Sequence, residues 1–266
     1  MSALLPVLVV DVGIAVVLLG LLSLLRPLRF FGIATRGRAA RMVLAGLVIG
    51  LAGGLLPAPE KRAAAAAKDA SQLDKVIPVW QFAERHETRI HASPAAVEKA
   101  VRSVSARDIA LFRLLTWLRS PRLPWLEKEE SILSPPADEP ILSVALRSGF
   151  QELAKEPGKE LVFGSLVMAP ASLGALPPAE LRKLRAEFTA EKFRALADPG
   201  YAKAVMNFRW MEEGDGWTRL VTETRVFATD SAVKRRFGIY WRAIYPGSSL
   251  LRRTWLAAIR HRAEAG

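Results

Sequence analysis

The 266-residue chain contains no cysteine and only three histidines. Without thiols it has no disulfide, no thiolate nucleophile and no cysteine-ligated metal, and its redox compartment cannot be inferred. His86 and His91 are five residues apart on a predicted strand, so they point to opposite faces and cannot bind one metal ion together. The sequence also lacks a phosphate-binding loop, a dinucleotide-binding glycine motif, a nucleophile elbow and an HExxH motif. We therefore expect no metal and no cofactor.

Acidic residues are scarce relative to basic ones. The chain has 38 Lys and Arg against 26 Asp and Glu, a formal net charge of +12, and 51% hydrophobic residues. This balance favours anionic partners such as lipid headgroups. No nucleic-acid-binding motif accompanies the charge, so nucleic acid is not an expected partner. The length leaves room for one large domain or two small ones.

Two apolar segments lie near the N-terminus. Residues 3–25 carry a single charge, Asp11, whose role the sequence does not define, and they are long enough to span a bilayer as a helix. The second span is expected at about 40–56; its uncharged part is short, but Arg41 can reach the headgroups and lengthen it. Residues 1–58 are thus predicted to form a transmembrane helical hairpin.

The loop between these segments contains five arginines and no acid. By the positive-inside rule it is cytoplasmic, which places the C-terminal domain on the extracytoplasmic side of a bacterial cytoplasmic membrane. Gly46, Gly50 and Gly54 leave one face of the second helix bare for close approach of the first. In the alternative, the second segment lies on the surface or re-enters the membrane, and the domain is cytoplasmic.

Residues 59–79 are charged and alanine-rich, which predicts a linker or stalk, and residues 80–266 are predicted to form one domain. Its pattern begins with a strand at 82–91 that places Phe82, Glu84, His86, Thr88 and Ile90 on one face. The further expected elements are helices at 94–104, 106–118, 141–148 and 177–196, hairpins at 150–168 and 201–227, and a closing helix after 230 that is broken and kinked at 246–247. A strand is the alternative for 141–148.

This order of elements resembles the START-like superfamily, which includes polyketide cyclases and lipid-transfer domains. The resemblance is carried by ERHETRIHASPAAVEKAV (84–101), GFQELAKEPGKELVFGSL (149–166) and WTRLVTETRVFATD (217–230), followed by the long helix. It implies an α+β helix-grip fold, in which an antiparallel sheet wraps around the last helix. The two N-terminal segments and the predicted 177–196 helix depart from the minimal pattern.

The resemblance also implies a cavity for an apolar or amphipathic ligand between the sheet and the last helix. Alternation along the strands places six side chains toward that cavity: Met206, Phe208, Trp210, Leu220, Thr222 and Thr224. The alternative is that they are plain core residues.

We expect the domain to bind a hydrophobic or lipid-like small molecule without turnover. One alternative is a cyclase- or hydrolase-like enzyme in which His86, beside Glu84, transfers protons in the same cavity; another is a non-catalytic interaction module. A basic strip on the last helix is a candidate for contact with the bilayer surface, although such cations also complement a helix dipole. The strip contains Lys234, Arg235, Arg236, Arg242, Arg252, Arg253, Arg260 and Arg262. Four arginines form this candidate surface: Arg252, Arg253, Arg260 and Arg262.

Overall fold

The computed structural model describes residues 5–26, 33, 35–64, 70–119, 135–177, 180, 183–184 and 187–266. The chain divides into two compact units. The first contains residues 1–58 and Arg235–Pro246, and the second contains Pro59–Lys234 and Gly247–Gly266. One helix, α10 (Ser231–Glu264), therefore supplies residues to both units.

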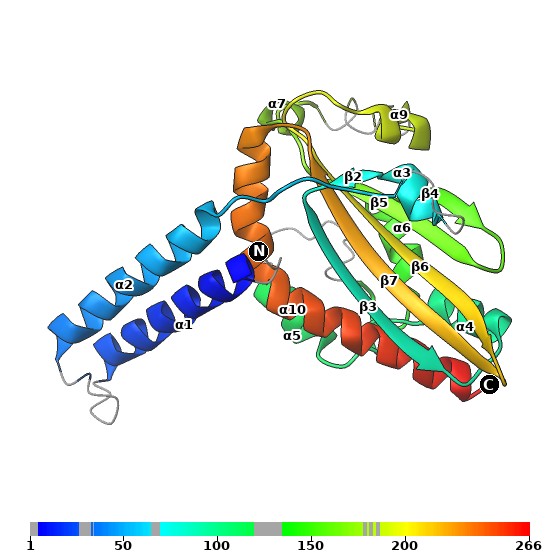
Figure 1. The fold of residues 1–266 in the computed structure, drawn as a ribbon, viewed down its shortest axis with the longest axis horizontal. Coiled ribbons are helices and arrows are strands. Elements are labelled where there is room, and N and C mark those ends of the chain that lie inside the picture. Colours follow the sequence, from blue (N-terminus) through cyan, green and yellow to red (C-terminus); the bar gives the residue numbers. More distant parts are fainter. Residues whose placement is uncertain are drawn as a thin grey trace. The chain divides into compact units, whose positions relative to one another are not determined.

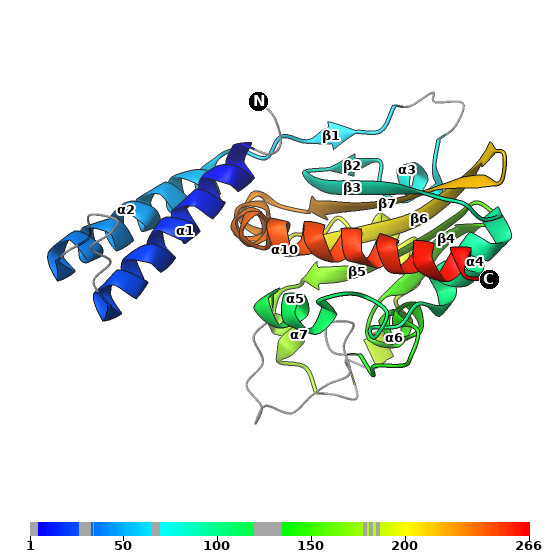
Figure 2. The same ribbon diagram turned by 90° about the horizontal axis from the view of Figure 1, so that it is seen from below.

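In the first unit, α1 (Leu5–Leu25) and α2 (Arg36–Leu55) run antiparallel, side by side (Figures 1 and 2). A Cβ added at Gly46 would lie 2.7 Å from the Val17 nitrogen, and one added at Gly13 would lie 2.5 Å from the Gly50 nitrogen. The two helices thus approach at backbone distance, as predicted for Gly46. Gly54 differs from the prediction, because it faces Ile239 of α10.

The second unit contains an α+β arrangement of short helices around antiparallel strands. In chain order, its elements before α10 are β1 (Lys61–Arg62), α3 (Gln72–Val76), β2 (Val79–Trp80), β3 (Phe82–Ile90), α4 (Pro94–Ser103), α5 (Phe112–Arg119), α6 (Ile141–Arg147), β4 (Gln151–Glu156), β5 (Glu160–Met168), α7 (Ala171–Gly174), α9 (Ala190–Ala195), β6 (Ala202–Gly214) and β7 (Trp217–Ala228).

Five strands form the main sheet in the order β3-β7-β6-β5-β4, and every neighbouring pair is antiparallel. Both predicted hairpins are present. The β4–β5 turn contains Gly158 at φ +73°, and the β6–β7 turn has positive φ at Gly214, Asp215 and Gly216. Because left-handed backbone is strained for most side chains, this Gly-Asp-Gly sequence suits the turn.

The main hydrophobic core lies between one face of this sheet, α4, α6 and the second half of α10. In that half, Trp255, Leu256 and Ile259 are at most 4% exposed. On the sheet, Phe163 and Phe208 lie in the same cluster. Figure 2 shows the C-terminal part of α10 running along the sheet. The α+β class with an antiparallel sheet and a long C-terminal helix is therefore confirmed, and the arrangement is consistent with a helix-grip fold.

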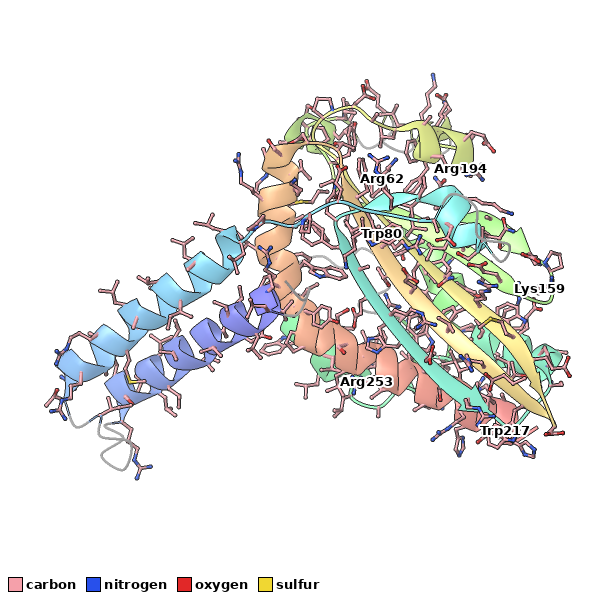
Figure 3. All side chains as sticks on the ribbon, viewed as in Figure 1. Arg62, Trp80, Lys159, Arg194, Trp217 and Arg253 are labelled. Atoms are coloured by element: carbon pink, nitrogen blue, oxygen red, sulfur yellow. The ribbon has the colours of Figure 1, made fainter. Side chains whose placement is uncertain are left out.

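The opposite face of the sheet is also covered, by α3 and α9. Leu73 of α3, Phe193 of α9 and Val162 of β5 form a second buried cluster. Arg225 is 6% exposed and forms an ion pair with Asp74 at 2.7 Å. Its guanidinium lies 3.7 Å from the centroid of the Trp80 ring, which is labelled in Figure 3. Desolvation raises the pKa of Asp74, but hydrogen bonds from Arg225 and Ser71 outweigh it, so the pKa is lowered.

Residues 59–79 differ from the expected stalk where the structure describes them. Lys61–Arg62 pairs with Val79–Trp80 in a two-stranded sheet, and Leu73 between them is fully buried. The alanine-rich composition indicated helix propensity, but the burial of Leu73 against the domain depends on distant residues. Part of this segment, 65–69, lies outside the described residues.

Three predicted helices also differ. The helix expected at 106–118 begins only at Phe112, because Asp108 accepts hydrogen bonds from the Ser105 nitrogen and hydroxyl at 2.8 and 2.9 Å and holds a turn there. The helix expected across 177–196 is interrupted at 188–189: α9 begins after the N-cap Thr189, and residues 180, 183–184 and 187 before it are also helical. Residues 178–179, 181–182 and 185–186 lie outside the described residues. The closing helix is not interrupted at Pro246, since α10 is one helix with this proline inside it, and the predicted kink falls where the two compact units divide.

Candidate functional site

The six side chains predicted to face a cavity come together on the sheet face that meets α10. Cross-strand partners place Met206 beside Thr224, Phe208 beside Thr222 and Trp210 beside Leu220. Thr224 is half-buried, and the other five are at most 3% exposed. All four apolar members belong to the main core cluster. The burial of these side chains is compatible with a packed core and with contact to a ligand. Their assignment to a cavity therefore stays a prediction.

Aromatic rings line the middle of this region. The Phe208 ring lies 5.3 Å from the Trp255 ring of α10 and 6.1 Å from the Phe163 ring of β5, centroid to centroid. The first contact is edge-on, a geometry that the ring quadrupoles favour. These contacts join the sheet to the second half of α10.

Two buried donors in this aromatic region lack hydrogen-bond partners. The indole nitrogens of Trp210 and Trp255 are inaccessible, and no partner for either lies among the described residues. Indole N–H groups usually find an acceptor when buried, and an unpaired buried donor costs about 1–3 kcal/mol. Each such group calls for an explanation, and an acceptor supplied by a bound molecule is one.

Polar side chains occupy the same sheet face nearer to the start of this half of α10. The Glu84 side chain is 1% exposed; one of its oxygens lies 2.7 Å from His86 Nε2, and the other accepts a hydrogen bond of 2.9 Å from the Ser248 hydroxyl. Ser249 Oγ lies 3.5 Å from the same His86 nitrogen. We call Glu84, His86, Ser248 and Ser249 the polar cluster.

The geometry of the polar cluster limits its chemistry. In a Ser-His-acid triad the carboxylate and the hydroxyl bind opposite ring nitrogens. Here Glu84 and Ser249 both lie at Nε2 of His86, so the ring cannot accept a proton from Ser249 at Nε2 while Glu84 holds the proton of Nδ1. The cluster can hold a proton between Glu84 and His86 and can offer polar contacts to a molecule. Sequence reasoning placed Glu84 beside His86 but missed both serines, which carry no motif.

The predicted membrane-surface arginines have different environments. Arg262 donates hydrogen bonds to the Ser103 carbonyl at 2.6 Å and to Asp108 at 2.7 Å, which attaches α10 to the end of α4. The Arg252 guanidinium lies 5.5 Å from the Trp255 ring centroid. Arg253, labelled in Figure 3, is exposed.

Arg260, the fourth of these arginines, is also exposed. Asp108 shows the electrostatic effect of the ion pair with Arg262. Desolvation raises its pKa, but hydrogen bonds from Ser105 and the charge of Arg262 outweigh this, so the pKa is lowered.

Other buried charges serve the fold. Glu160 is 1% exposed and accepts hydrogen bonds from the Gln72 and Leu73 nitrogens at the start of α3 and from Asn207. Lys203 donates to the carbonyls that end α9, including the Leu196 carbonyl at 2.9 Å, and burial lowers its pKa. These groups satisfy backbone atoms at helix ends. Among the described residues, no group of three His, Asp or Glu side chains is placed to hold a metal ion.

The helices of the first unit expose apolar side chains. By length and composition, α1 and α2 are both able to cross a membrane. Leu8 and Leu18 of α1 and Leu44 and Leu51 of α2 are 58–62% exposed. The features described so far define an α+β protein with an antiparallel sheet, a long C-terminal helix and two apolar N-terminal helices.

Comparison with known proteins adds little to this description. No protein-family model matches the chain, and no curated protein matches it. Its structure is similar to the crystal structure of Ara h 8.0201 at 14% identity and a TM-score of 0.17, over 63% of this chain and 98% of that one. A similarity of that size carries no argument, so the function must be argued from the site.

Proposed function

We propose that the protein is a membrane-anchored START-like domain that binds a hydrophobic or lipid-like small molecule, without turnover, between the main sheet and the second half of α10. The observation that carries this proposal is the pair of unpartnered indole donors, Trp210 and Trp255, inside the main core cluster. A ligand with an acceptor oxygen, such as an ester, a ketone or a hydroxyl, would pair with a donor while its apolar part packs against the aromatic rings.

Membrane anchoring is supported by the exposed leucines of α1 and α2 and by the close packing of the two helices. Apolar side chains facing outward are favourable in lipid and unfavourable in water. An anchored domain would meet lipid-like ligands at the membrane where they are concentrated.

The arginines between the two apolar segments favour a cytoplasmic loop and an extracytoplasmic domain. Alkaline phosphatase fused after Gly266 should be active in a bacterial host, while green fluorescent protein fused there through the Sec pathway should not fluoresce. The reverse pattern would place the domain in the cytoplasm and contradict the sidedness, while leaving ligand binding intact.

Ligand binding is tested by extracting the full chain in mild detergent and identifying co-purified molecules by mass spectrometry. Trp210→Phe and Trp255→Phe each remove one donor but keep an aromatic ring. Each variant should co-purify with about 2- to 10-fold less ligand than the unchanged protein, which corresponds to the loss of one hydrogen bond. Trp117→Phe is the control, since Trp117 is 54% exposed and lies outside the main core cluster. Absence of any bound molecule would favour a non-catalytic interaction module instead.

An enzyme is the second candidate, and the polar cluster is the observation that favours it. A buried Glu84–His86 pair with Ser248 and Ser249 nearby could move a proton in a cyclase- or hydrolase-like reaction. A panel of ester and polyketide-like substrates would reveal turnover. Turnover that is lost in His86→Ala and kept in the control His91→Ala would support the enzyme, and equal turnover in both would exclude this role of His86.

A further inference from the structure

The first half of α10 belongs to the same compact unit as the hairpin. It is joined to the C-terminal end of α2 by a guanidinium. Arg242 is 4% exposed and donates hydrogen bonds of 2.5 Å to the Gly54 carbonyl and 2.7 Å to the Leu56 carbonyl. Ile239 also packs at Gly54, where an added Cβ would lie 3.2 Å from its side chain.

These contacts fix where the segment lies along the hairpin. A helix ends with carbonyl groups that have no partner within the helix. Arg242 binds such a carbonyl at Gly54 and one immediately after the helix, at Leu56. Leu55 is the last residue of α2, and Pro57 follows soon after it. If α2 spans the bilayer, these carbonyls therefore lie at the boundary between the hydrocarbon core and the headgroups. Ile239 and Arg242, near the middle of Arg235–Pro246, are therefore at that level too.

The composition of this segment is that of a membrane interface. Four aromatic side chains occur within nine residues: Phe237, Tyr240, Trp241 and Tyr245. The Phe237 ring contacts those of Tyr240 and Trp241, and the Trp241 ring contacts that of Tyr245, with centroids 5.8–6.0 Å apart. Phe237 and Trp241 are buried, and Tyr240 is 38% exposed. Trp and Tyr are enriched at both membrane–water interfaces, where the ring is in the apolar layer and the polar atom in the wet one.

The outward face of the segment mixes cations and apolar side chains. Arg235, Arg236 and Ala243 are exposed, Ile239 is 43% exposed and Tyr240 is 38% exposed. Arginine and isoleucine on one face are unfavourable together in water or in hydrocarbon, but they suit the boundary, where long cationic side chains reach the phosphates.

We propose that Arg235–Pro246 is an interfacial helix that lies in the headgroup layer of the bilayer spanned by α1 and α2, with Arg235 and Arg236 contacting anionic lipid phosphates. The assignment rests on the proposed membrane anchoring and extends it to a second, surface-lying contact. Arg235 and Arg236 belong to the basic strip expected from sequence, but the four arginines selected there for the membrane surface lie in the other half of α10.

The absence of native cysteine makes the test direct. The full chain carries one cysteine at a time, Tyr240→Cys or Ala243→Cys, labelled with an environment-sensitive fluorophore and reconstituted into vesicles of phosphatidylcholine and phosphatidylglycerol. Quencher groups attached near the headgroup or deep in the acyl chain report depth. Leu47→Cys, exposed in the middle of α2, reports the span itself, and Arg253→Cys is the matched control on the second half of α10.

The proposal expects labels at positions 240 and 243 to be quenched about twice as strongly by the shallow quencher as by the deep one. The Leu47→Cys label should show the reverse preference, and the Arg253→Cys label should be weakly quenched by both. Equal weak quenching at 240, 243 and 253 beside a deep Leu47→Cys label would overturn the proposal and leave the anchor standing.

Three further results would also overturn it. Quenching at 253 equal to that at 240 would show that the first half of α10 is not a distinct interfacial segment. A Leu47→Cys label that neither quencher reaches would remove the membrane span, and the interfacial helix with it. Contact of the same face with a second copy of the chain would appear as quenching lost at 240 together with energy transfer between labelled copies.

Discussion

Replacing Glu160 by Gln tests whether one buried carboxylate holds α3 against the sheet face that is opposite α10. Glu160 Oε2 accepts from the Gln72 nitrogen at 2.8 Å, and Oε1 accepts from the Leu73 nitrogen at 3.3 Å and from Asn207 at 2.6 Å. A glutamine keeps one acceptor oxygen but turns an NH₂ group toward donors. With hydrogen bonds to charged groups worth about 1.5–3 kcal/mol each, the net loss should be about 2–4 kcal/mol.

Amide hydrogen exchange of the full chain in detergent measures this loss locally. Opening of α3 exposes the Gln72 and Leu73 amides, so a destabilisation of about 2–4 kcal/mol should speed their exchange by roughly 30- to 700-fold. Glu152→Gln is the matched control, because Glu152 is exposed on the neighbouring strand, and it should change local stability by less than about 0.5 kcal/mol. Equal exchange in the two variants would refute the argument that Glu160 anchors α3.

Three further outcomes are expected. Gly46→Ala places a methyl group 2.7 Å from backbone of α1, and it should lower the stability of the full chain in detergent, measured by thermal unfolding, by about 1–3 kcal/mol. Gly50→Ala, whose nearest contact is 4.0 Å, should not lower it. Equal losses in the two variants would contradict the packing of α1 against α2 at Gly46. Arg242→Lys keeps the charge but cannot match the two-carbonyl geometry, so the mobility of a spin label at Ala243→Cys should increase, and unchanged mobility would contradict the tie to α2. The pKa of Asp108 in the folded protein is lowered below its usual 3.8, so its contribution to stability is complete above pH 3.8 and is lost as the pH falls through the folded pKa. In chemical denaturation, the free energy of unfolding of Asp108→Asn should therefore depend less on acid pH than that of the unchanged protein. An identical pH dependence would refute this.

Local signals in the sequence predicted much of the architecture. A serine followed by proline is typical of a helix start, and in the structure the Ser93 hydroxyl accepts a hydrogen bond of 3.3 Å from the Ala96 nitrogen at the start of α4. Turns rich in glycine and the alternation along the strands predicted both hairpins and the shared inward face of β6 and β7. These features depend on residues close in sequence, so composition and periodicity define them.

The features that were missed depend on residues far apart in the chain. Ser248 and Glu84 are 164 residues apart, and Gln72 and Glu160 are 88 apart. No periodicity links such residues, because their pairing follows from how the sheet and helices pack. The tie between Arg242 and the end of α2, 188 residues from Gly54, is likewise invisible before the fold is known.

The assignment of Arg235–Pro246 to the hairpin unit has a consequence for biosynthesis. About 175 residues separate the hairpin from this third helix, and at about 5–20 residues per second a ribosome needs roughly 9–35 s to translate them. Throughout that interval Gly54 and Leu56 present bare carbonyls with no guanidinium to bind them. During synthesis α1 and α2 are therefore complete but lack the hydrogen bonds from Arg242. A messenger RNA truncated before the Arg242 codon yields a protein that never forms these bonds.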